Sequence, residues 1–142
     1  HERVKALAKQ AGLEYNFDIA VVANSFDAHR FIQLAKSHYK GDAAEELLFK
    51  AYFTEGKNIA DKSFLQSLGE AIGIEAVEIE NMLNTQSFAE AVQKDIAEAD
   101  QIGIHAVPYF VFNRKYAISG AQPDTVFLQA LQQVHAESDA AT

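Results

Sequence analysis

The residues best suited to binding chemistry lie at one bend near the end of the chain. Gly103 can end a helix, and an aromatic run typical of a strand begins just after Pro108. Between them stand His105, Ala106 and Val107. A cis Val107-Pro108 bond at the head of a strand would leave the N–H and C=O of Val107 open to a partner. The alternative is a trans proline that ends a loop, the commoner form. His105 could face the same partner, although loop histidines without a role are common.

A second candidate binding position is the start of the helical pattern that follows Asn24. The first turn of a helix has free backbone N–H groups and favours anions, so Asn24 and His29 could contact a carboxylate or a thiolate. The alternative is structural: Asn24 or Ser25 caps the helix, and Arg30 takes part in a surface ion pair.

The residue types exclude several other chemistries. The chain has no cysteine, which excludes disulfides, thiolate metal sites and a cysteine nucleophile within these residues. Its histidines show no zinc-ligand spacing with acids, and no glycine-rich phosphate loop is present, so we expect no metal and no cofactor. With 20 acidic and 12 basic residues the net charge is −8. No basic cluster is available for phosphates, so we expect no nucleic acid and no anionic membrane as partner. No apolar run approaches the ~20 residues that span a bilayer.

Residues 1–24 combine a helical pattern, ended by Gly12, with a stretch of alternating residues. From Leu13 to Val22 the alternation predicts a strand or extended segment with one buried face. That face would carry Leu13, Tyr15, Phe17, Ile19 and Val21.

Residues 25–102 show a helical pattern throughout, divided by glycines and capping residues. Asp42 and Glu45 form a start similar to a capping box, and Asp61 opens another helix. Three aromatic residues on neighbouring helix positions could line a groove, although most aromatic residues are expected in the core; they are Phe49, Tyr52 and Phe53. The predicted helices are 25–41, 42–56, 61–73, 76–83 and 87–102.

After residue 103 the hydrophobic period changes to two. Tyr109–Phe112 and Tyr116–Ser119 predict a β-hairpin, and Pro123 is expected to begin a last helix. Residues 137–142 are expected to form a frayed tail. The inner face of the last helix would carry Val126, Phe127, Ala130, Leu131 and Val134.

Four ordered motifs together carry a resemblance to a known family. They are NSFDAHR (24–30), AYFTEGKNI (51–59), AVPYFV (106–111) and SGAQP (119–123). Each motif alone is weak, but the four in this order and spacing are specific. From about Leu13 to Val134 the chain resembles the DsbA-like thioredoxin superfamily, in particular its FrnE-type branch of disulfide oxidoreductases and isomerases.

The resemblance implies an α+β fold class, mostly helical, that forms the C-terminal part of a DsbA-like thioredoxin fold. Residues 25–102 would be the inserted helical domain. Residues 103–136 would be the C-terminal half of the thioredoxin fold, with a hairpin and a closing helix. Pro108 would be the cis-proline beside the redox site. The substrate-binding residues would then be Val107, Pro108, Ala106 and His105.

In the family the redox C-x-x-C lies in an N-terminal strand-and-helix unit, upstream of anything that resembles this chain. The resemblance therefore implies that this unit is missing and that no residue here is catalytic. We expect a fragment of a cytoplasmic thiol–disulfide oxidoreductase that is redox-inactive by itself and whose partner is a protein or peptide thiol or disulfide. The absent strands would leave an exposed edge on Tyr109–Phe112, which favours a homodimer.

Two other functions remain open at this point. A cysteine-free peptide-binding module of thioredoxin type would keep the proline platform and lack the redox chemistry. An enzyme similar to the glutathione-dependent 2-hydroxychromene-2-carboxylate isomerases would instead use a glutathione site near Asn24. Fold resemblance alone does not decide among them.

Overall fold

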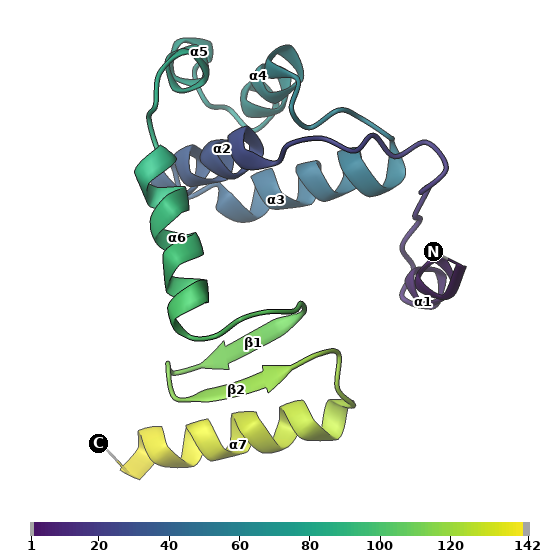
Figure 1. Cartoon of the computed structure of the whole chain (residues 1–142), viewed down its shortest axis with the longest axis vertical. Coiled ribbons are helices and arrows are strands. Elements are labelled where there is room, and N and C mark those ends of the chain that lie inside the picture. Colours follow the sequence, from purple (N-terminus) through teal and green to yellow (C-terminus); the bar gives the residue numbers. More distant parts are fainter. Residues whose placement is uncertain (1, 141–142) are drawn as a thin grey trace. The chain divides into compact units, whose positions relative to one another are not determined.

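A computed structural model describes residues 2–140, with side chains through Ser138. It contains two compact units, residues 1–95 (unit 1) and residues 96–142 (unit 2). The elements in chain order are α1 Glu2–Gln10, α2 Phe26–Ser37, α3 Gly41–Phe49, the π-helix η1 Lys50–Thr54, α4 Lys62–Ala71, α5 Ala76–Asn84, α6 Ala89–Gln101, β1 Tyr109–Phe112, β2 Tyr116–Ser119 and α7 Asp124–Ala140 (Figure 1). The boundary between the units lies inside α6, whereas the sequence pattern places it after residue 102.

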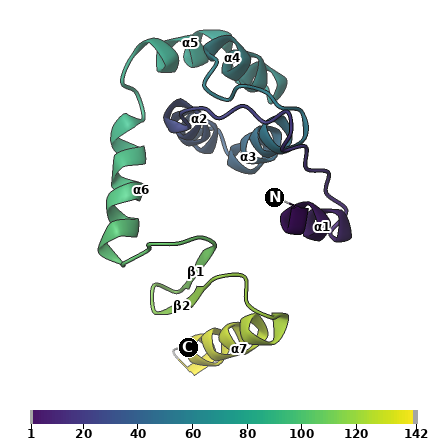
Figure 2. The same ribbon diagram turned by 45° about the vertical axis from the view of Figure 1, so that its right-hand side comes forward.

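Unit 1 is built around α2, which contacts α3, α4 and α5. Figures 1 and 2 both show α2 and α3 side by side. Phe31, Leu34 and Ala35 recur at helical spacing, so they form one apolar face of α2, and all three are buried. The core consists of Ala28, Phe31, Leu34, Ala35, Ala44, Leu48, Leu65, Leu68, Ile74, Ile79, Met82 and Leu83.

Close approach of α4 to α5 depends on Gly69. A Cβ atom at this position would lie 2.3 Å from Cδ1 of Ile79 and 3.2 Å from the Phe31 ring. Glycine therefore occupies this helix interior for a packing reason, despite its cost in helix propensity.

The segment from Leu13 to Val22 is not a strand, and its alternating face is not buried as predicted. Tyr15 and Phe17 are half-buried, whereas Leu13, Ile19 and Val21 are exposed. The alternation fails because residues 17–19 form a turn and the two aromatic side chains contact a helix instead of a sheet.

Of the two predicted helix starts, one is confirmed and one is wrong. Asp61 caps α4 as expected, because its side chain accepts a hydrogen bond from the N–H of Phe64. The capping box of Asp42 and Glu45 is wrong: α3 begins one residue earlier, after Lys40, without a side-chain cap. The helix expected to end at Gly56 changes to π geometry at Lys50.

Unit 2 contains a two-stranded antiparallel hairpin with α7 beside it (Figure 1). Tyr109 pairs with Ser119 and Phe112 with Tyr116, which confirms the predicted hairpin. The rings of Phe110 and Phe127 meet edge to face with their centroids 4.8 Å apart, so this face of β1 packs on α7.

The last helix begins at Asp124, one residue after Pro123. Of its predicted inner face, Leu131 is exposed and the other four residues are half-buried. The frayed tail expected from residue 137 is wrong for 137–140, which continue α7, and residues 141–142 lie outside the described part. Within residues 2–140 no helix has the length and apolar character needed to cross a membrane.

Arg30 is buried, with 3% of its surface exposed, so the predicted surface ion pair is wrong. It does pair with Asp27, at 2.8 Å, but its guanidinium also donates to the main-chain oxygens of Ser87 (2.9 Å), Thr85 (2.6 Å) and Met82. The carbonyl of Met82 belongs to the last turn of α5, where helical partners are absent. Arg30 therefore ties α2 to the end of α5.

Replacement of Arg30 by alanine should lower the free energy of unfolding by about 2–4 kcal/mol, because buried carbonyls lose their donors. Arg30→Lys should retain part of the lost free energy of unfolding, since a lysine keeps the charge but lacks the planar guanidinium fork. Urea unfolding measures both, with Lys94→Ala on the exposed surface of α6 as the control. Equal stability of Arg30→Ala and Lys94→Ala would contradict the assigned role.

Candidate functional site

The Val107-Pro108 peptide bond is cis and lies immediately before β1. Val107 is 86% exposed, and His105, Ala106 and Pro108 are exposed as well. The Pro108 carbonyl accepts a hydrogen bond from the N–H of Gly120 at 2.8 Å, which holds the loop to the end of β2. Unit 2 therefore brings the four predicted substrate-binding residues together in one open loop.

The backbone of Val107 is available for a partner. In residues 2–140, no hydrogen bond of the structure uses its N–H or its C=O. Both groups are strong hydrogen-bonding groups, and on an exposed residue they are open to water or to a second chain. The loop therefore presents a main-chain donor and a main-chain acceptor that no other described residue uses.

This binding surface continues along the outer edge of β1. The hydrogen bond from Gly120 to Pro108 makes these two residues a hydrogen-bonded pair. Along an antiparallel ladder, hydrogen-bonded pairs alternate with pairs that share no hydrogen bond, so the next pair, Tyr109 and Ser119, shares none. The N–H and C=O groups of Tyr109 and Val111 therefore point away from β2. An extended peptide could pair with this edge as an added strand.

The tip of the hairpin is held on both sides within unit 2. Asn113 and Arg114 both have positive φ angles, 49° and 56°, which reverses the chain between the strands. Arg114 forms an ion pair with Glu98 near the end of α6. On the other side Lys115 pairs with Glu137 of α7 at 2.9 Å.

Three donors surround the Glu137 carboxylate. The Tyr116 hydroxyl donates to one oxygen, Gln133 donates to the same oxygen at 3.1 Å, and the Lys115 ammonium binds the other. These bonds, the one from Tyr116 foremost, lower the pKa of the Glu137 carboxyl to about 2. Glu137 therefore stays ionised and fixes the hairpin to the end of α7.

The second predicted site lies in unit 1, whereas the proline loop lies in unit 2. The Asn24 side chain accepts a hydrogen bond from the N–H of Phe26 at 2.9 Å and is used in the turn before α2. His29 is exposed on the first turn of α2. A glutathione or thiolate contact at these two residues remains a prediction.

The sequence pattern did not show how the predicted groove of Phe49, Tyr52 and Phe53 is completed. Leu13, Glu14 and Tyr15 lie against α3 and η1, and together they form an open cleft of about 350 Å³. Tyr15 stacks on Phe53 with ring centroids 4.7 Å apart. Tyr52 contacts Phe53 but does not line the cleft. The sequence signal for the contact of this segment with the helix is the alternation in residues 13–22, which places Leu13 and Tyr15 on the same apolar face.

Metal binding finds no support in the described residues. Among residues 2–140 no three histidine, aspartate or glutamate side chains are placed to hold one ion. The proline loop itself holds no acid and one histidine, His105. What the loop offers to a partner is therefore backbone hydrogen bonding and apolar contact.

Over residues 1–132 the chain matches the DsbA-like thioredoxin domain family. It belongs to that family. A solved structure described as a probable DsbA oxidoreductase, from Streptomyces coelicolor, is 33% identical, with a TM-score of 0.89 over 96% of this chain and 59% of that one. The uncharacterised protein YwbO of Bacillus subtilis is 27% identical over 130 residues, which cover 90% of this chain and 64% of that protein.

Membership of the DsbA-like family confirms the predicted fold class, a mostly helical chain with a hairpin that matches part of a DsbA-like fold. The chain spans roughly three fifths of the length of these two relatives. The cis bond before β1 agrees with the prediction for Pro108.

The pKa of Glu137 leads to a pH-dependent contribution to stability. A carboxyl whose pKa is lowered by folding stabilises the folded state above its ordinary pKa, 4.5, and loses that effect as the pH falls toward about 2. The melting temperature of the chain should therefore exceed that of Glu137→Gln at pH 7, and the gap should close between pH 4.5 and 2. Carbon-13 NMR of the Glu137 carboxyl checks the pKa directly. Titration near 4.5 would contradict the three-donor arrangement.

Proposed function

We propose that this chain is the substrate-binding part of a FrnE-type thiol–disulfide oxidoreductase whose redox C-x-x-C lies in a further part of the protein. The observation that carries the proposal is the exposed cis Val107-Pro108 loop in a member of the DsbA-like family. The likeness to a probable DsbA oxidoreductase, 33% identical, supports it. No cysteine occurs in the 142 residues, so the chain supplies binding and not the reacting sulfur.

In the proposed reaction a substrate thiolate attacks the C-x-x-C disulfide and forms a mixed disulfide, which releases one enzyme thiolate. A second substrate thiolate then attacks the substrate sulfur of that bond. The substrate leaves as a disulfide, and its two electrons remain on the enzyme dithiol. In the opposite direction each step reverses. The role of Val107 is to donate its N–H and accept through its C=O, which fixes the substrate backbone beside the reacting sulfurs.

The proposed partner is an extended, unfolded polypeptide that carries a thiol or a disulfide. That polypeptide would meet the N–H and C=O of Val107. The outward N–H and C=O groups of Tyr109 and Val111 form the edge that the upstream strands would cover in the full-length protein. In this chain by itself the edge could pair with a second copy. Cytoplasmic localisation is part of this proposal and rests on the FrnE-type resemblance.

A second candidate is a peptide-binding module without redox chemistry. It is favoured by one observation, the presence of an intact cis-proline loop in a stretch of 142 residues without cysteine. The two candidates agree on peptide binding by the loop and differ only in whether a dithiol acts beside it.

The reading frame upstream of His1 and the activity of the full-length product separate these candidates. We expect a C-x-x-C there and a protein that reduces insulin disulfides in the presence of dithiothreitol. Replacement of the first cysteine by serine should abolish this activity. Pro108→Ala should lower it about tenfold or more, because the substrate backbone is no longer positioned. Pro123→Ala, before α7, is the matched control and should leave activity within about twofold.

Two results would overturn the redox proposal. One is a full-length protein without a C-x-x-C that still binds extended peptides, with binding lost in Pro108→Ala, which would establish the binding module. The other is reductase activity that survives serine at both cysteines.

A further inference from the structure

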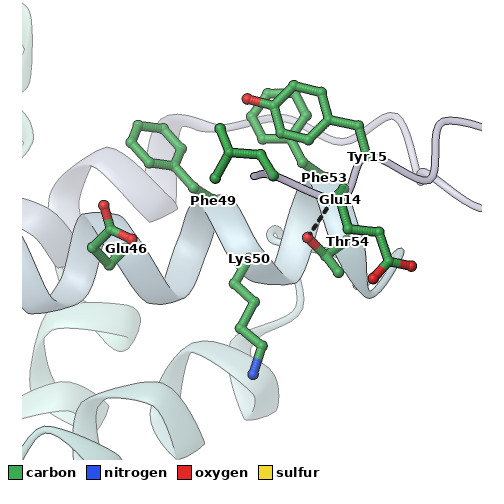
Figure 3. A pocket seen from close by; sticks show the side chains of 8 residues that line it. Glu14, Tyr15, Glu46, Phe49, Lys50, Phe53 and Thr54 are labelled. Atoms are coloured by element: carbon green, nitrogen blue, oxygen red, sulfur yellow. Dashed lines mark hydrogen bonds between the residues drawn. The ribbon is translucent and has the colours of Figure 1, made fainter. Parts of the chain in front are cut away.

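The open cleft in unit 1 has an aromatic lining that the proline loop does not use. Phe49 and Phe53 project from the same side of the α3–η1 helix, and Tyr15 lies over Phe53 (Figure 3). Leu13, from the same segment as Tyr15, also lines the cleft. Phe53 is at the centre of this group, because its ring contacts Tyr15 at 4.7 Å and Phe49 at 6.3 Å between centroids. The cleft therefore has an apolar floor formed by two segments distant in sequence.

The segment over the cleft is held to η1 by hydrogen bonds that main-chain carbonyls accept. The N–H of Asn16 donates to the Phe53 carbonyl at 2.6 Å, and the Asn16 side chain donates to the Thr54 carbonyl at 2.8 Å. The Thr54 hydroxyl donates to the Glu14 carbonyl at 2.7 Å (Figure 3). The two bonds from Asn16 satisfy carbonyls at the end of a helix, which have no helical partner. The cleft is therefore a built feature that exists before any ligand arrives.

A glycine allows the same segment to come close to the chain that leaves η1. Gly56 has a φ angle of +62°, and a Cβ on it would lie 2.5 Å from the carbonyl oxygen of Ile19. A larger residue would both strain the backbone and push the segment away.

The exposure of the lining indicates a chain-like ligand. Phe49 is 55% exposed and Leu13 is 54% exposed, although both are large apolar residues. An enclosed small-molecule site would bury most of its ligand, whereas this cleft is open. In residues 2–140 no hydrogen bond of the structure uses the N–H or C=O of Tyr15. Side chains of an extended peptide could therefore enter the cleft while its backbone pairs with Tyr15.

The charges around the cleft favour a basic ligand. Glu46 lies one turn before Phe49, is exposed and forms no ion pair in the described part of the chain. Glu14 also lines the cleft, and within residues 2–140 its carboxylate is bonded only to the neutral side chain of Asn16. The one lining cation, Lys50, is paired with Glu55 at 3.3 Å. Figure 3 shows the carboxylates of Glu14 and Glu46 at opposite ends of the cleft, with Glu46 beside Phe49. A lysine or arginine at that end would meet the Glu46 carboxylate and the exposed ring of Phe49, which attracts cations.

We propose that this cleft binds an extended peptide segment in which an aromatic side chain stands next to lysine or arginine. The aromatic ring inserts against Phe49 and Phe53, and the neighbouring cation pairs with Glu46. This binding needs no thiol, so it stands independently of the redox function proposed above.

Fluorescence anisotropy with the cysteine-free chain tests the proposal. The probes are labelled six-residue peptides that carry Phe-Lys, Phe-Glu or Ser-Lys at the centre of a Gly-Ser background. The Phe-Lys peptide should bind tightest. Phe49→Ala should weaken its binding about tenfold, as for an aromatic anchor at an interface. Glu46→Lys should weaken it about fivefold and improve binding of the Phe-Glu peptide.

Matched variants separate the cleft from general surface effects. Tyr39→Ala removes an aromatic side chain that is fully exposed elsewhere in unit 1, and Glu80→Lys makes the same charge change on α5. Neither should change binding of the Phe-Lys peptide. The proline loop would pair with peptide main chain whatever the side chains, so the difference in affinity between the Phe-Lys and Ser-Lys peptides reports on the cleft alone, and Phe49→Ala should remove that difference. Equal binding of Phe-Lys and Phe-Glu, or an unchanged affinity in Phe49→Ala with an unaltered circular dichroism spectrum, would overturn the proposal.

Discussion

The buried guanidinium of Arg30 is the interaction on which unit 1 depends most. It satisfies carbonyls at the end of α5 and in the chain that follows, and it does so from the helix at the centre of the core. A buried charge is costly without partners, so the segment 82–87 has to keep the path that supplies them. This constraint fixes how α5 leaves the core and where α6 starts.

The end of the α3–η1 helix imposes a second constraint on unit 1. The α3–η1 helix ends in π geometry, which leaves carbonyls at Phe53 and Thr54 that Asn16 satisfies. π-Helical turns are rare and occur often at functional sites. Here the turn places Phe49 and Phe53 beneath Tyr15, so the same hydrogen bonds that complete the helix end also create the aromatic cleft.

In unit 2 the open backbone of Val107 is the feature that supports the proposed function. It is useful only because the hairpin behind it is held in place, by Gly120 at the loop and by Glu137 at the tip. A single hairpin is marginal without packing, and α7 supplies that packing through Phe127. Binding groups that are exposed and yet positioned are what substrate recognition requires.

Local signals in the sequence determined much of this protein. The period-two pattern predicted both strands, and Asp61 predicted a helix start. Four motifs in their order and spacing predicted the DsbA-like fold and, through that resemblance, the cis bond at Pro108. The burial of Arg30 and the path of residues 13–22 were decided only by the tertiary structure. Both depend on carbonyls far away in sequence, at Met82 and Phe53, that no local pattern identifies. The period of the hydrophobic residues shows which face of a helix or strand is buried. The partner of a polar group is instead set by how distant segments pack.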